Sequence, residues 1–156
     1  MSRAQRKVLA SWLSASGAIV LLVSLFLPWT HQLSTHLLGI AGAAAALRGV
    51  PSDPTAWQVY SSVDALLALI AAGVFVVALV GPRPSRIVAV LATALALAFV
   101  VHAAVVPPTN GLENVFPALL SESNLRRAVS PGPGVILAII ALVVATVGLE
   151  LSLTAD

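Results

Sequence analysis

The sequence has no cysteine and very few charged residues. None of its 156 residues is Cys, and only 9% are Asp, Glu, Lys or Arg. Without cysteine, disulfides, thiolate metal sites and thiol–disulfide redox chemistry are excluded. The sequence also lacks a Gly-rich phosphate loop, a serine-nucleophile motif and an acid pair within an apolar run. No residue is therefore identified as catalytic or cofactor-binding, which weighs against an enzyme without excluding one.

What the chain has in abundance is apolar residues. They make up 59% of the sequence, and the mean hydropathy is +1.02. This is more apolar than is usual for a water-soluble domain, so the lipid bilayer is the expected surrounding. The net charge of +2 does not indicate nucleic-acid binding, because the basic residues are scattered between apolar runs and form no patch.

Four apolar runs are long enough to cross a bilayer as helices. About 20 residues rising 1.5 Å each reach roughly 30 Å, the thickness of a hydrocarbon core. The expected helices cover residues 8–27, 63–80, 87–106 and 134–151. A basic head before the first run is also typical of a signal peptide, but this run is longer than a signal core and three more follow. We therefore predict an all-α fold: a four-transmembrane-helix bundle forming a single domain over residues 1–156.

The connections and the basic residues predict the orientation. Residues 81–86 form a short inner loop, whereas residues 29–62 and 107–132 form two outer loops, of which the first is the longer. The basic residues then on the inner side are Arg3, Arg6, Lys7, Arg83 and Arg86, and those on the outer side are Arg48, Arg126 and Arg127. This excess predicts that both termini are cytoplasmic and that the chain is a multi-pass protein of the cell (plasma) membrane.

The outer loops contain further segments of interest. Residues 37–47 are apolar but too short to span, which predicts a helix at the interface or against the bundle. Residues 115–129 form an amphipathic piece interrupted by proline. Ser61, three residues before Asp64, is typical of an N-cap with an acid in the first helical turn.

Small residues at helical spacing predict how the helices pack, because lipid removes most of the hydrophobic drive between them. In the last helix these residues are Gly134, Ala138, Ala141, Ala145 and Gly148, at spacings of 4, 3, 4 and 3. Comparable stripes are Ala89, Ala92, Ala96, Phe99 and Ala103 in the third helix, Ala10, Ser14 and Gly17 in the first, and Ala65, Ala68 and Ala72 in the second. Because alanine is abundant, only the last of the four helices has a seam better than chance alignment.

Aromatic residues mark both ends of the expected spans. The first helix ends at Pro28, and Trp29 follows it. Trp29, Trp57 and Tyr60 are expected at the outer headgroup level, and Trp12 near the inner one. We predict that Trp29 lies where the second helix re-enters the bilayer and anchors the first outer loop.

Four short stretches carry a resemblance: LFLPW at 25–29, AWQVYSSVDALLAL at 56–69, VVPP at 105–108 and the glycine that opens the last helix. Together they resemble a widespread family of small, uncharacterised bacterial four-helix membrane proteins. This resemblance implies a fold and a location but no activity. Tyr60 stands where that family suggests Phe, and residues 41–46 form an alanine-rich insertion. The loop lengths are also similar to those of claudin-like tetraspans, in architecture only, since the paired outer cysteines are absent.

Few polar residues are candidates for chemistry. Asp64 is the most suggestive, because an acid at a span boundary could gate ions or pair with a cation, although capping the helix is the favoured interpretation. His31, His36 and His102 are expected on the outer side, where they could converge on a metal with Asp64 or Glu113. No spacing demands such a site, so ordinary interfacial histidines are the favoured interpretation and no cofactor is predicted.

These observations leave three function classes open. The leading prediction is a non-enzymatic structural or interaction component of the membrane, which binds a protein partner or a second copy of the chain through its outer loops or its seam. The second is a small transporter or channel subunit that acts as an oligomer and uses Asp64 and His102. The third is a metal-dependent enzyme on the outer face, which rests on the three histidines.

Overall fold

The computed structural model describes residues 2–31, 52–108 and 129–155 and contains four long helices. The long helices are α1 (Arg3–Ser24), α5 (Ser61–Val80), α6 (Arg83–Val105) and α9 (Pro133–Thr154), and the short elements are β1 (Thr30–His31), α4 (Ala56–Val59) and β2 (Ser130–Pro131). Each long helix is long and apolar enough to cross a membrane. The predicted helix at 37–47 lies outside the described residues, as does all but the last residue of the predicted segment at 115–129.

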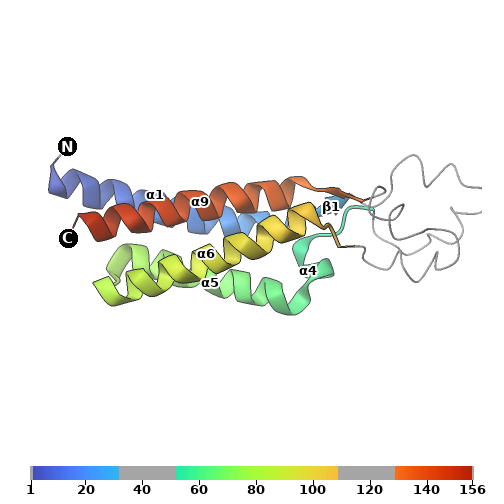
Figure 1. The fold of residues 1–156 in the computed structure, drawn as a ribbon, viewed down its shortest axis with the longest axis horizontal. Helices are drawn as coiled ribbons and strands as arrows, with labels where there is room; N and C mark the ends of the chain where they lie inside the picture. Colours follow the sequence, from blue (N-terminus) through green and yellow to red (C-terminus); the bar gives the residue numbers. More distant parts are fainter. Residues whose placement is uncertain (1, 32–51, 109–128, 156) are drawn as a thin grey trace, which may run out of the picture.

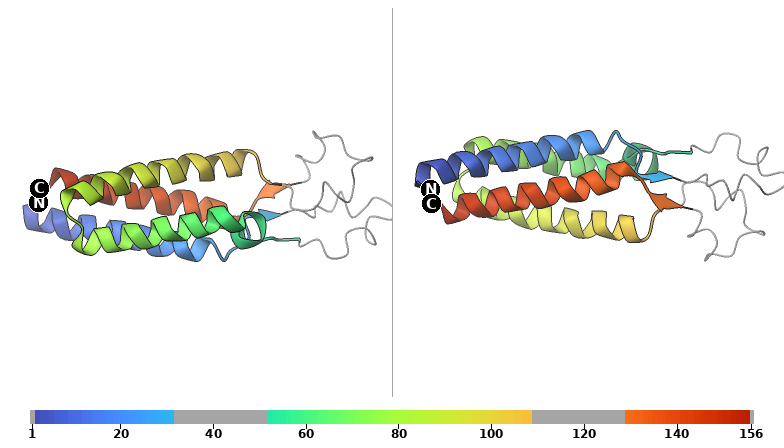
Figure 2. Two further views of the ribbon diagram at one scale, coloured as in Figure 1. Left: turned by 90° about the horizontal axis from the view of Figure 1, so that it is seen from below. Right: turned by 90° about the horizontal axis from the view of Figure 1, so that it is seen from above.

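The four long helices run side by side, with both termini at the same end (Figures 1 and 2). The tight turn between α5 and α6 lies at this end too, which we call the terminal end. At the opposite end the chain leaves and re-enters the described part, next to β1, β2 and α4 (Figure 1). The helices therefore form an antiparallel bundle whose longer connections share one end.

The helix ends differ from those expected from hydropathy alone. Helix α1 begins earlier, at Arg3, because Ser2 forms a capping box: Ser2 Oγ accepts from the Gln5 backbone at 3.2 Å, and the Ser2 backbone donates to Gln5 Oε1 at 2.9 Å. The basic head therefore belongs to the helix. The prediction that Ser61 caps α5 is wrong, because the N-cap is Tyr60 and no side chain forms a capping hydrogen bond there.

Close packing between the first and last helices depends on glycine. A Cβ atom added to Gly17 would lie 2.7 Å from both Ala141 O and Ala145 N, and one added to Gly148 would lie 2.6 Å from Ser14 N. The whole predicted stripe of α9 is buried, as are Ala10, Ser14 and Gly17 of α1. The backbones of α1 and α9 therefore approach as closely as small residues permit.

The other two helices use larger residues than predicted. The buried stripe of α5 consists of Asp64, Leu67, Ala71, Val74 and Ala78. The predicted stripe of α5 was wrong, since Ala65 and Ala72 are exposed. On α6, Ala89, Ala96 and Ala103 are buried as expected, but Thr93 and Val100 complete the stripe in place of Ala92 and Phe99. Thr146 of α9 donates to Thr93 at 3.0 Å, so a polar contact also joins α6 to α9.

Candidate functional site

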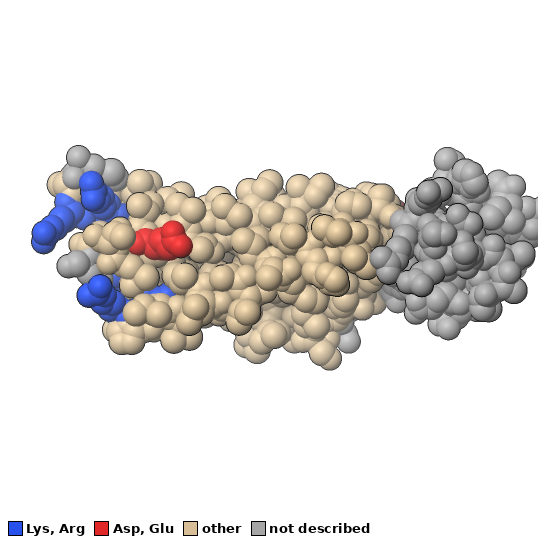
Figure 3. Space-filling view, in the orientation of Figure 1, with Lys and Arg blue, Asp and Glu red and all other residues tan. Residues whose placement is uncertain are grey.

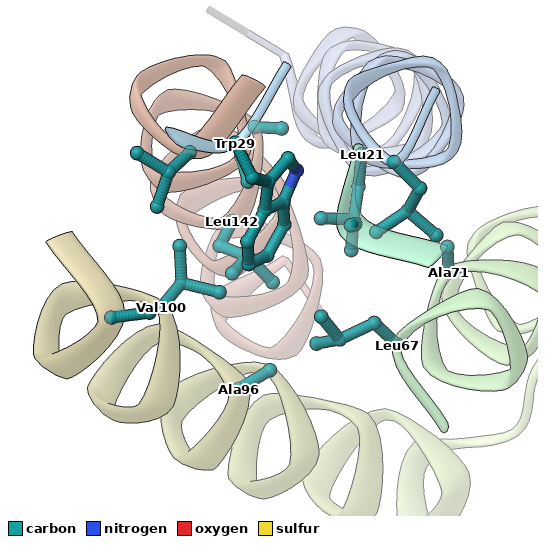
Figure 4. Packing of buried hydrophobic residues seen from close by; sticks show 13 residues of the cluster. Leu21, Trp29, Leu67, Ala71, Ala96, Val100 and Leu142 are labelled. Carbon is teal, nitrogen blue, oxygen red and sulfur yellow. The ribbon is translucent and has the colours of Figure 1, made fainter. Parts of the chain in front are cut away.

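The end of the bundle opposite the termini is organised around Trp29. Its side chain is 1% exposed and is the largest of those that are fully buried. The ring points into the space between the helices, where Leu67, Val100 and Leu142 also lie (Figure 4). Trp29 therefore lies inside the bundle, between the helices, and is not a ring on its surface; its expected position at the headgroup level stays a prediction.

Polar groups of Trp29 and its neighbour Pro28 join three separate parts of the chain. The Trp29 backbone N–H donates to Pro54 O at 2.9 Å, and the Gly132 N–H donates to Trp29 O at 2.8 Å. The Gly134 N–H donates to Pro28 O, also at 2.8 Å. We call these three segments, residues 28–31, 54–60 and 130–134, the junction.

The indole of Trp29 also closes the end of α1. Its Nε1–H donates to Ser24 O at 2.9 Å. The last carbonyl groups of a helix have no partner within the helix. Ser24 O accepts from the Leu27 N–H at 3.2 Å, and the indole is its second donor. Trp suits this position because its large apolar ring fills the core while its N–H donates to the end of the helix.

Short strand pairings complete the junction. Strands β1 and β2 are antiparallel, with Thr30 opposite Pro131 and His31 opposite Ser130. A further bridge pairs Pro28 with Thr55. The described residues on either side of the two longer connections, 32–51 and 109–128, are thus held by hydrogen bonds or by helix packing.

Three aromatic contacts surround this base. Tyr60 lies edge-on to both Trp29 and Phe99, with ring centroids 6.4 and 5.4 Å apart. Burial raises the pKa of the Tyr60 phenol above its ordinary 10.0. The phenol is therefore protonated at neutral pH. Trp57 is 37% exposed and packs against Phe26, with ring centroids 6.1 Å apart, so of the predicted outer aromatics it is the one on the surface of the bundle.

Asp64 lies one helical turn beyond the junction, on the packed face of α5. Its side chain is fully buried, and neither carboxylate oxygen has a hydrogen-bond partner in the described part of the chain. The same is true of the hydroxyl oxygen of Thr30 in β1. A buried carboxylate without a partner is costly when ionised, so this position suits a proton, or a donor or cation brought from outside the described residues.

The structure does not bring together those of the predicted metal candidates that it describes. His31 Nδ1 pairs with Asp53 Oδ1 at the surface, His102 is exposed on α6, and Asp64 is buried. His36 and Glu113 lie outside the described residues. Among the described residues, no group of three His, Cys, Asp or Glu side chains could hold a metal ion.

Asp53 was not singled out in the sequence, yet it is the charged partner of His31. The hydrogen bond from His31 lowers the pKa of the Asp53 carboxyl below its ordinary 3.8, and the Ser52 hydroxyl, which donates to Asp53 Oδ2 at 2.9 Å, lowers it further. His31 comes just before the 32–51 connection and Asp53 shortly after it, so the pair joins the two ends of that connection across 22 sequence positions. No spacing rule would have identified it.

One glycine of the junction allows close packing against Trp29. A Cβ atom added to Gly134 would lie 2.6 Å from Trp29 Cδ1 and 2.8 Å from Pro28 O. Gly134 thus opens the α9 seam and touches the junction at the same time. Ala138 and Ala141 follow it on the same buried face, and Ala138 belongs to the hydrophobic core that contains Trp29.

Compared with models of known protein families, with curated proteins and with solved structures, the chain matches none of them. The resemblance to small bacterial four-helix proteins, drawn from short motifs, therefore stays a prediction. What can be concluded from the described residues is coarser: the chain is an α-helical protein with four helices able to cross a membrane.

Proposed function

We propose that this protein is a non-enzymatic, membrane-embedded interaction component. In this proposal the bundle is a scaffold that holds the two connections, 32–51 and 109–128, beside each other for a protein partner or a second copy of the chain. The observation that supports it is the junction, where Pro28 O and Trp29 O accept from Gly134 and Gly132, and the Trp29 N–H donates to Pro54 O, so that the bases of both connections are tied together. Such an arrangement is useful for presenting two segments as one surface.

We further propose that the junction faces outward and that both termini are cytoplasmic, in the cell membrane. All the described Lys and Arg residues lie near the N-terminal ends of α1 and α6, and basic side chains gather at the terminal end (Figure 3). An excess of basic residues in short flanks supports a cytoplasmic location.

Cysteine labelling tests this orientation directly, because the chain has no native cysteine. We expect Ser52→Cys to react with a membrane-impermeant maleimide in intact cells, and Ser85→Cys to react only after the cells are opened. Ser85 is in the first turn of α6, so the two variants probe opposite ends with the same chemical change. The reverse labelling pattern would overturn the orientation.

Photo-crosslinking tests the interaction itself. A photoreactive residue at Ser130, which is exposed in β2, is expected to form a crosslink to one defined protein or to a second copy in intact membranes. The same residue at Leu79, which is 61% exposed on the apolar face of α5, serves as the control and should yield lipid adducts. If Ser130 gives no protein adduct and native mass spectrometry finds a monomer, the proposal fails.

Asp64 supports a second candidate function, a small transporter or channel subunit that acts as an oligomer. Ionisable residues buried in membrane helices mark ion or proton paths in many proteins. In this case Asp64→Asn would reduce ion or proton flux in proteoliposomes, whereas Asp53→Asn, at the surface, would leave it unchanged. Equal flux in the wild type and Asp64→Asn would remove this candidate. His102 does not share the Asp64 site, because it is exposed on α6.

A further inference from the structure

A groove of about 610 Å³ runs between α1 and α5 in the half of the bundle nearest the termini. Val8, Trp12 and Ile19 of α1 and Phe75 and Leu79 of α5 form its apolar walls, and Lys7 lies at its end. Val8, Trp12, Ile19 and Leu79 are each at least half exposed. The groove is therefore an open channel on the surface of the bundle, not an enclosed cavity.

The length of the groove matches one leaflet of a bilayer. From Lys7 to Ile19, the rise of α1 amounts to about 18 Å, close to half of a hydrocarbon core of about 30 Å. Ser16 also lines the groove, but its hydroxyl donates to Leu13 O at 3.1 Å within its own helix. The groove thus offers an apolar surface along its length and a positive charge at the end that would lie near the headgroups.

Charge at the terminal end is mostly positive; among the described residues, the exposed acid near this end is Glu150, close to the end of α9. Arg3 and Lys7 are four residues apart, so they lie on one side of α1, and Arg6 is adjacent in the sequence. Basic side chains gather at this end of the molecule (Figure 3). A second copy in the same orientation would bring the same cationic cluster to the same depth, so like charges would repel. A ligand with an apolar tail and an anionic head has the complementary pattern.

We propose that this groove binds one acyl chain of an anionic phospholipid, with Lys7 and Arg3 attracting the phosphate and Trp12 lying beside the upper part of the chain. Basic side chains next to an apolar intramembrane surface recognise anionic lipids in this way, and the indole ring suits the headgroup boundary. The site needs only that the terminal end reaches a membrane surface. It is therefore independent of the orientation and of the partner proposed above.

Fluorescence of Trp12 provides the test. In a Trp57→Phe background only Trp12 and the buried Trp29 remain, so lipids with brominated acyl chains should quench Trp12 selectively. Two kinds of mixed vesicle are compared: in one the phosphatidylglycerol is brominated, and in the other the phosphatidylcholine is. At the same mole fraction of brominated lipid, we expect brominated phosphatidylglycerol to quench more. The preference should be about fivefold in apparent affinity, the effect of one basic residue at a membrane surface. Equal quenching by the two lipids would overturn the proposal.

Two matched pairs of variants separate a defined site from general charge attraction. Lys7→Gln should abolish the preference, while Arg83→Gln, at the same end but outside the groove, should retain it. Ser16→Phe fills the groove without changing charge and should also reduce quenching by phosphatidylglycerol; Ala94→Phe, exposed on α6, should not. If Arg83→Gln lowered the preference as much as Lys7→Gln, or Ala94→Phe acted like Ser16→Phe, the attraction would be diffuse and the groove would not be a site.

Discussion

Gly134 lies directly against the indole ring of Trp29, so close that a Cβ atom at position 134 would stand 2.6 Å from Trp29 Cδ1. The same atom would stand 2.8 Å from Pro28 O and 2.9 Å from Ser24 O. Backbone oxygens cannot move aside as a flexible side chain can. We therefore expect Gly134→Ala to lower the free energy of unfolding by about 1–3 kcal/mol, the usual effect of overpacking.

Gly73 provides the matched control for that measurement. It is on α5, and a Cβ atom added there would meet nothing within 4 Å. Gly73→Ala should therefore stabilise the protein by up to about 1 kcal/mol through helix propensity. Reversible unfolding in bicelles, followed by circular dichroism, compares the two variants. Equal effects of the two substitutions would contradict the close contact between Gly134 and Trp29.

A second prediction concerns the contact between α1 and α9 at Gly17. A Cβ atom at Gly17 would lie 2.9 Å from Ala145 Cβ and 2.7 Å from the backbone atoms Ala141 O and Ala145 N. Gly17→Ala should destabilise the bundle by about 1–3 kcal/mol. The double variant with Ala145→Gly should recover only part of that loss, since the backbone contacts persist. Complete recovery in a double-mutant cycle would show that the backbones are further apart than described.

The hydrogen bond from Trp29 Nε1 to Ser24 O can be tested by removing the donor alone. Trp29→Phe keeps a large apolar ring but leaves that carbonyl without the indole donor, so we expect a loss of about 1–2 kcal/mol in unfolding free energy. Trp57→Phe, at a position that is 37% exposed, is the control and should change it by less than about 0.5 kcal/mol. The two variants should be compared in the same bicelle assay.

The pair formed by His31 and Asp53 makes a prediction about pH. Because the pKa of Asp53 is lower in the folded protein than its ordinary 3.8, its contribution to stability is complete above that value and is lost as the pH falls through the lowered pKa. In an NMR titration of the Asp53 carboxyl, His31→Gln should return the pKa toward 3.8. His102→Gln should leave it unchanged, and the same titration curve in wild type and His31→Gln would refute the pairing.

Asp64 and Thr30 allow a test of buried groups without partners. Removing the charge with Asp64→Asn, or the hydroxyl with Thr30→Val, should leave the unfolding free energy unchanged or raise it, because neither substitution breaks a bond found in the described residues. Breaking a buried ion pair, in contrast, typically costs about 3–5 kcal/mol. A loss of that size in Asp64→Asn at neutral pH would mean that Asp64 has a charged partner.

Much of the architecture could be predicted from hydropathy and small-residue spacing. Four long apolar runs and a short turn after Gly81 are enough to predict an antiparallel hairpin of α5 and α6, and Gly134 and Gly148 at the two ends of an alanine stripe predict close packing of α9. The buried face of α5 could not be predicted in this way. It uses Leu67 and Val74, and with so many apolar residues several faces of the helix look equally suitable.

The junction was harder to predict, for a different reason. A tryptophan after a proline at the end of an apolar run is as typical of a membrane interface as of a buried cap, and only its contacts with distant residues decide between them. Strands of two residues carry no readable alternation of polar and apolar residues. The groove next to Trp12 depends on how far α1 and α5 diverge, a relationship between helices that neither helix encodes alone.

The close contact of α1 with α9 joins the two long helices of the described structure that are farthest apart in the sequence. Of the helix pairs in the described structure, this one has the most extensive contact. A nascent chain that has inserted α1, α5 and α6 thus lacks its largest interface until the ribosome has completed α9. During that interval the small-residue face of α1, with Gly17 at its centre, is open to lipid or to other inserted helices, so the bundle cannot close before α9 has been made.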